Sequence, residues 1–81
     1  MLSRIWKWLT KNSLTVEDYR VLQWLSDREH GRVIHCSIVH ADELEDIDVI
    51  KIGRSLQRYD LIVKGASWEL TDKGREVIGE M

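Results

Sequence analysis

The sequence of 81 residues has no proline, no phenylalanine and a single cysteine, Cys36. One cysteine excludes an internal disulfide and is typical of proteins from a reducing compartment. Without proline, the helix ends have to be set by capping side chains and by the five glycines. The apolar residues before Lys11 are too few, and too interrupted by Arg4 and Lys7, for a signal peptide or a membrane span. We therefore expect a cytoplasmic protein without a membrane partner.

The composition predicts one small folded domain. Apolar residues make up 43% and charged residues 32% of the chain, a balance typical of globular sequences. A domain of this size has a thin core and little room for a large substrate pocket. Cys36 has histidine neighbours but no evident third group to orient them, and no glycine-rich phosphate loop is present. We expect neither enzyme activity nor a cofactor.

Helices and short strands alternate along the chain. Hydrophobic spacing, capping residues and β-branched runs predict a helix over residues 2–11, a helix over 16–30, a strand over 32–36, a helix capped by Ser37, a helix over 47–59, strands over 61–64 and 68–70, and a helix capped by Thr71. The helix over 16–30 has the clearest start, because Thr15 and Asp18 have nearly the pattern of a capping box. Gly31 is its expected end.

The helix expected over residues 47–59, with Asp46 as its N-cap, separates apolar from basic side chains. At 100° per residue, one face carries Val49, Ile52, Leu56 and Tyr59, and the opposite side carries Lys51, Arg54 and Arg58. The net charge of the chain is −2, so attraction to nucleic acid would have to come from a local patch of this kind. Gly53 lies near the apolar face, where we expect it to let another helix cross close by.

Two segments resemble a known family. Residues 56–62, LQRYDLI, are similar to the end of a recognition helix that runs into the first strand of a wing. Residues 70–76, LTDKGRE, resemble the stretch that leaves the wing in MarR-like and related small transcription regulators. The resemblance covers about residues 15–80 and implies an α+β fold, a winged helix-turn-helix domain with a short three-stranded sheet and an extra N-terminal helix. Asp60 stands where the family usually has glycine, and the wing tip lacks the basic cluster of many members.

The resemblance implies a transcriptional regulator that binds double-stranded DNA sequence-specifically. The helix-turn-helix is expected over about residues 37–59. In such domains its second helix, here about residues 47–59, enters the major groove, and the wing, here residues 61–70, lies on the backbone. The implied DNA contacts are Lys51, Arg54, Ser55, Gln57 and Arg58 on the helix, where Gln57 can read an adenine edge, and Lys64 on the wing.

An acidic cluster points to an alternative function. Five acids, Asp42, Glu43, Glu45, Asp46 and Asp48, lie on the helix and turn that cross the DNA backbone in such domains, where negative charge repels phosphate. As a contact surface they favour a winged-helix module that binds another protein, such as an adaptor or antagonist of a regulator. A continuous positive strip would favour DNA, and its interruption by the acids would favour a protein partner.

The first helix is expected to form a unit of its own, residues 1–12, beside a winged domain of residues 14–81. It carries an apolar stripe of Leu2, Ile5, Trp6 and Leu9. About ten residues make only a marginal helix in water, so the stripe needs a partner surface. We expect a homodimer seam there, with a lid over the core of the same chain as the alternative. A lipid interface, suggested by the basic face with Trp8, is a more distant alternative.

Histidine and cysteine gather in one stretch, as His30, His35, Cys36 and His40. Zinc takes such ligands in a tetrahedron. On a strand, however, the adjacent residues His35 and Cys36 point to opposite faces and cannot readily share one ion. We therefore expect no metal site, with Cys36 as a buried thiol among surface histidines.

Overall fold

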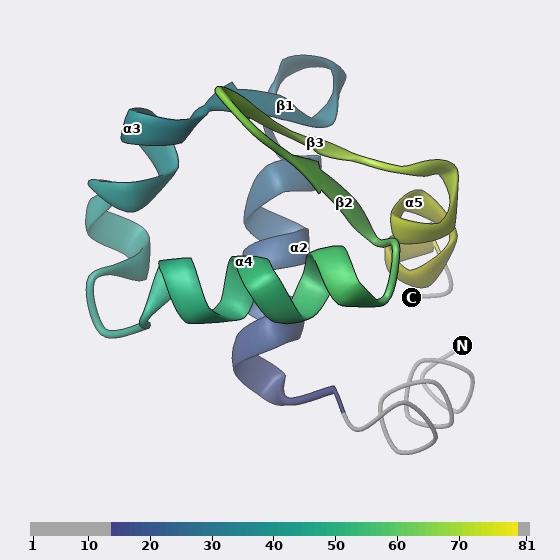
Figure 1. The fold of residues 1–81 in the computed structure, drawn as a ribbon, viewed down its shortest axis with the longest axis horizontal. Coiled ribbons are helices and arrows are strands. Elements are labelled where there is room, and N and C mark those ends of the chain that lie inside the picture. Colours follow the sequence, from purple (N-terminus) through teal and green to yellow (C-terminus); the bar gives the residue numbers. More distant parts are fainter. Residues whose placement is uncertain (1–13, 80–81) are drawn as a thin grey trace.

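The computed structural model describes residues 14–79, which form an α+β domain (Figure 1). Its elements are α2 (Val16–Ser26), the 3-10 turn η1 (Glu29–Gly31), β1 (Arg32–Ile34), α3 (His35–Val39), the 3-10 turn η2 (Asp42–Leu44), α4 (Val49–Arg58), β2 (Ile62–Lys64), β3 (Ser67–Leu70) and α5 (Asp72–Gly79). The helix expected over residues 2–11 lies outside the described residues. Within residues 14–79, no helix is long and apolar enough to cross a membrane.

The sheet is antiparallel and has the order β1-β3-β2. In the hairpin of β2 and β3, Lys64 lies opposite Trp68, and on the other edge of β3 Val33 lies opposite the same tryptophan. Because side chains alternate between the two faces of a strand, Trp68 and Leu70 both point inward, and both are buried. The hairpin follows α4 and reaches back towards β1 and α3 (Figure 1).

The hydrophobic core lies between α2, α4 and the inner face of the sheet. Its largest fully buried side chains are Trp68, Leu22, Leu25, Ile38, Leu56, Leu61, Val21 and Val77. The apolar face predicted for α4 is confirmed, since Val49, Ile52 and Leu56 are buried and Tyr59 packs against the core. Burial of this face fixes the rotation of α4 about its axis, and so decides which of its side chains face solvent.

The start of α2 is as predicted, but its end is not. The Thr15 backbone N–H donates to Asp18 Oδ2 over 2.9 Å, and the Asp18 N–H donates to Thr15 Oγ1 over 3.1 Å, which completes the capping box. The helix ends at Ser26 instead of His30. His30 and Gly31 have left-handed φ angles of 59° and 62°, and this reversal directs the chain into β1.

Two helix starts differ from the prediction. The strand expected over residues 32–36 ends at Ile34, because β3 offers partners only as far as Ser67, opposite Ile34. α3 therefore begins at His35, with Ile34 in the N-cap position in place of Ser37. α4 is capped by Asp48, whose Oδ1 accepts the Lys51 N–H over 3.2 Å, and Asp46 is not its cap.

The close neighbour of Gly53 is the ring of Trp68 rather than a crossing helix. A Cβ atom at Gly53 would overlap ring carbons of Trp68 and would lie 3.1 Å from Lys64 Cδ. The wing therefore lies directly on α4. The absence of a side chain at this one position lets a fully buried indole fit between the helix and the hairpin.

The segment 70–76 closes the base of the wing. Thr71 caps α5 as predicted, because its Oγ1 accepts the Gly74 N–H over 3.1 Å, and its hydroxyl donates to the Asp60 carbonyl oxygen. The Thr71 N–H donates to the Leu61 carbonyl oxygen over 3.1 Å. A Cβ atom at Gly74 would overlap that same oxygen, so this segment packs against the entry to β2.

Candidate nucleic-acid interface

The outer side of α4 is basic. Lys51, Arg54 and Arg58 are exposed there, with Gln57 exposed and Ser55 half-buried beside them. The helix contains no acidic residue. Within residues 14–79, the three cations take part in no ion pair. Their charge therefore faces solvent and is free to meet an anionic ligand.

Lys64 comes from the wing and lies beside α4. Its side chain is half-buried, with Cδ near Gly53 and Nζ 5.6 Å from the centroid of the Trp68 ring. An ammonium over an indole face is attracted by the negative face of the ring. The structure thus places this lysine beside Gly53 of α4.

Sequence reasoning missed the contact between α3 and the wing. Trp68 Nε1–H donates to His35 Nδ1 over 2.9 Å, and the two ring centroids lie 5.7 Å apart. The His35 backbone N–H donates to the Ala66 carbonyl oxygen at the wing tip over 2.9 Å. A signal was available, since a buried tryptophan N–H normally finds an acceptor. The assignment of His35 to a strand hid that acceptor.

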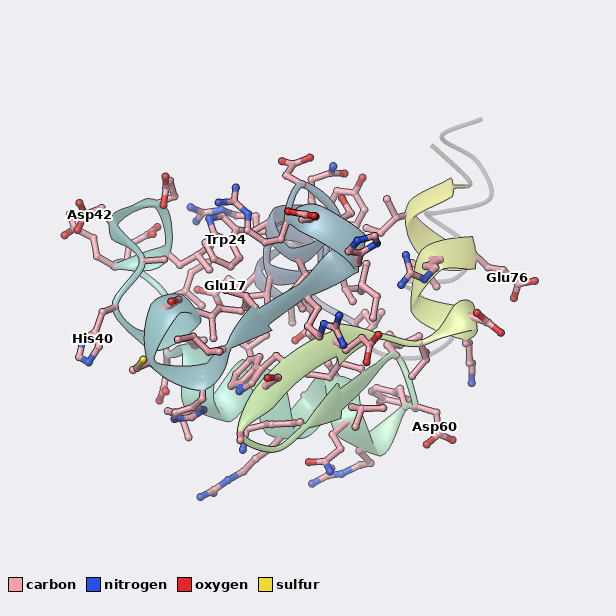
Figure 2. The ribbon with its side chains drawn as sticks, turned by 90° about the horizontal axis from the view of Figure 1, so that it is seen from above. Glu17, Trp24, His40, Asp42, Asp60 and Glu76 are labelled. Atoms are coloured by element: carbon pink, nitrogen blue, oxygen red, sulfur yellow. The ribbon has the colours of Figure 1, made fainter. Side chains whose placement is uncertain are left out.

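The acidic cluster is largely held by contacts within the domain. Arg20 donates to both carboxylate oxygens of Asp46, over 2.9 and 3.3 Å, and to the Glu43 carbonyl oxygen over 3.1 Å. The hydrogen bond from Arg20 is the main cause that lowers the pKa of Asp46 and raises that of Arg20. Asp48 caps α4. Figure 2 shows Asp42, on η2, far from Asp60, which follows the end of α4.

A shallow groove separates α2 from η2. It has a volume of about 280 Å³ and is lined by Tyr19, Arg20, Gln23, Trp24, Asp27, Glu43 and Leu44. Arg28 lies over the Trp24 ring, 4.2 Å from its centroid, and Trp24 Nε1 donates to Glu43 Oε1 over 3.4 Å. A backbone hydrogen bond at Glu43 lowers the pKa of the Glu43 carboxyl, and the bond from Trp24 lowers it further by a smaller amount. The groove is therefore aromatic, with the acids Asp27 and Glu43 and the cations Arg20 and Arg28 around it.

The reasoning about the histidines and the cysteine needs correction. His35 and Cys36 begin a helix, so the argument from opposite strand faces is wrong. Cys36 is exposed rather than buried. In the part of the chain that the structure describes, no group of three or more His, Cys, Asp or Glu residues is placed to hold a metal ion.

Comparison with known proteins gives one structural match. No protein-family model matches the chain, and no curated protein does. The structure is similar to the crystal structure of a MarR family transcriptional regulator from Streptomyces coelicolor, with a TM-score of 0.76 and 24% sequence identity. The match covers 98% of this chain and 59% of the length of the regulator. This chain thus has the winged helix-turn-helix fold found in that regulator.

Proposed function

We propose that this chain is a small DNA-binding transcriptional regulator that recognises a specific sequence. In this proposal α4 enters the major groove, whose width admits an α-helix, and the hairpin of β2 and β3 lies on the backbone. The observation that carries the proposal is the solvent-facing side of α4, with three exposed cations and no carboxylate on the helix. The fold shared with a transcriptional regulator supports it by analogy.

Each side chain of this surface has an expected role. Arg54, in the middle of α4, is suited to a bidentate contact with guanine, and Gln57 to one with adenine. Lys51, nearer the start of the helix, meets a base or a phosphate, and Ser55 faces the DNA beside it. Arg58, its last residue, and Lys64 on the wing contact phosphates, which position the protein without reading sequence.

The test is a mobility shift with random-sequence DNA at two salt concentrations, followed by selection of the tightest sequence. We expect binding that weakens with salt, because cations displaced from the phosphates drive association. Arg54→Ala should weaken binding to the selected sequence. The matched control is Arg32→Ala, which removes an equally exposed arginine from β1. Absence of binding above background at low salt would overturn the proposal.

We further propose that the regulator is a homodimer, held by the stripe of Leu2, Ile5, Trp6 and Leu9. The sequence pattern supports this proposal. A dimer would also place two winged helices on two DNA half-sites that lie one helical turn apart. Replacement of Ile5 and Leu9 by glutamate should change the sedimenting species from dimer to monomer. The thermal unfolding transition of the domain should stay as in the wild type. A wild-type chain that sediments as a monomer at tens of micromolar would contradict the dimer.

One observation favours a second candidate function, a protein-interaction module. The groove between α2 and η2 combines the half-buried Trp24 with Glu43 and Asp27. Arg20 also lines the groove but is paired with Asp46, so the groove suits a basic, apolar segment. A synthetic peptide of residues 1–13, which holds three basic and no acidic side chains, is a suitable probe. This candidate predicts that the peptide shifts the Trp24 indole NMR signal, and that Glu43→Lys abolishes the shift. A peptide without effect would count against it.

A further inference from the structure

Trp68 connects α3 to α4 and β2, the last two of which belong to the proposed DNA interface. Its indole N–H donates to His35 on α3, its ring lies against Gly53 on α4, and Lys64 of β2 lies over the same ring. The side chain is fully buried. A change in the position of this indole would therefore move the lysine that faces the DNA backbone.

The bond to His35 requires one protonation state. An indole N–H can only donate, so His35 Nδ1 has to accept and carries no proton, which leaves the proton of the neutral ring on Nε2. A buried N–H that loses its acceptor destabilises the folded state. The neutral imidazole thus stabilises the observed position of Trp68, and the His35 backbone N–H, bound to Ala66, holds the wing tip nearby.

We propose that His35 is a positioning residue for the wing, whose neutral side chain holds Trp68, and through it Lys64, against α4. Protonation of His35 places two donors face to face and releases the indole. The inference rests on the proposed function in one respect, the contact of Lys64 with a phosphate. The hydrogen bond itself is independent of DNA.

Lys64 and Cys36 are the charged or titratable side chains described next to the pair. The ammonium of Lys64, on β2, faces it across the Trp68 ring, so a positive His35 would add a second cation next to the first. The adjacent titratable side chain, Cys36, is exposed. β1 contributes the uncharged Val33 opposite Trp68, and α4 contributes Gly53.

Two substitutions of His35 distinguish the effect of its hydrogen-bond acceptor from the effect of its aromatic ring. His35→Asn places a carboxamide oxygen close to the position of Nδ1 and is not protonated at neutral or mildly acidic pH. His35→Phe keeps an aromatic ring of similar size and has no acceptor. Both leave His30 and His40 in place, so a pH effect common to all histidines remains in both variants.

The first measurement needs no DNA. In ¹⁵N-labelled protein, the Trp68 indole signal of the wild type at pH 8 should resemble that of His35→Asn, and at pH 5 it should move to the position seen in His35→Phe. The signal of His35→Asn should stay unchanged between the two pH values. A wild-type signal that does not move would overturn the proposal.

The second measurement is the salt dependence of DNA binding at pH 8 and pH 5. Loss of one phosphate contact lowers the slope of log affinity against log salt by about one. We expect this decrease for the wild type at pH 5 and for His35→Phe at both pH values, but not for His35→Asn. An indole that moves without a change in slope would overturn the role of His35 in DNA contact. An indole that moves in a protein with no DNA affinity would overturn the proposed function and leave the positioning of the wing established.

Discussion

Gly53 of α4 and Trp68 of β3 are in such close contact that a Cβ atom on the glycine would overlap the indole ring. Gly53→Ala would improve helix propensity by about 1 kcal/mol. It would also push a fully buried ring from its site, and overpacking of this kind costs about 1–3 kcal/mol. We expect a net loss of unfolding free energy, measured by urea denaturation. The control is Gly65→Ala, because a Cβ there meets nothing within 4 Å. Equal stability of the two variants would contradict the contact.

The left-handed backbone of Asp60 predicts a stabilising substitution. Its φ is 61°, a conformation that costs most L-residues about 1–2 kcal/mol and glycine almost nothing. Asp60→Gly should raise the unfolding free energy by about 0.5–1 kcal/mol, and Asp60→Val should lower it. Asp27→Gly, at a φ of −81°, is the control and should give no gain. A loss on Asp60→Gly would mean that the aspartate side chain stabilises the turn.

The ion pair of Arg20 and Asp46 predicts a pH-dependent contribution to stability. The hydrogen bond from Arg20 lowers the pKa of Asp46 in the folded state. The ionised carboxylate then favours folding, so the contribution is present above the pKa of an unfolded aspartate and is lost as pH falls through the folded pKa. Arg20→Gln should therefore melt earlier than wild type at pH 7, and the difference should disappear in strong acid. A carboxyl ¹³C titration should show the pKa of Asp46 rising in this variant, whereas in Arg32→Gln it should stay as in wild type.

The proposed DNA contacts predict different patterns of loss. Arg54→Ala should reduce the preference for a selected sequence by about 1–3 kcal/mol relative to a scrambled one. Lys64→Ala and Arg58→Ala should weaken both sequences alike and lower the salt slope by about one. Lys51→Ala tests whether the start of α4 meets a base or a phosphate. The unfolding free energy of the variants at the exposed helix residues should stay within about 0.5 kcal/mol of that of the wild type, which thermal melts can check. Equal losses on both sequences for Arg54→Ala would exclude base recognition by this side chain.

Patterns that repeat along the sequence were predicted correctly. The rotation of α4 follows from apolar residues at helical spacing, and the start of α2 follows from Thr15 and Asp18. The hairpin follows from two apolar runs around Gly65. Each of these elements is indicated by residues that are close together in the sequence. The DNA contacts on α4 remain predictions. The structure leaves Lys51, Arg54, Gln57 and Arg58 exposed and Ser55 half-buried.

Features set by distant residues could not be predicted. β1 ends at Ile34 because its partner strand begins at Ser67, and nothing near His35 indicates this limit. α2 ends at Ser26, the backbone is extended at Arg28, with a ψ of 155°, and the chain then turns at His30, whose carbonyl oxygen accepts a hydrogen bond from Arg75, 45 positions away. The bond between His35 and Trp68 likewise joins residues 33 positions apart.

The central place of β3 in the sheet has a consequence for synthesis of the chain on the ribosome. β1 and β2 are both made before β3, yet neither pairs with the other, so both wait for residues 67–70 as their common partner. A nascent chain that has reached only Lys64 can form α2, α3 and α4 but has no sheet and no indole to place against Gly53. The contact between the wing and α4 is therefore completed only after residues 67–70 are made, and a product terminated before them would carry the helix-turn-helix without its wing.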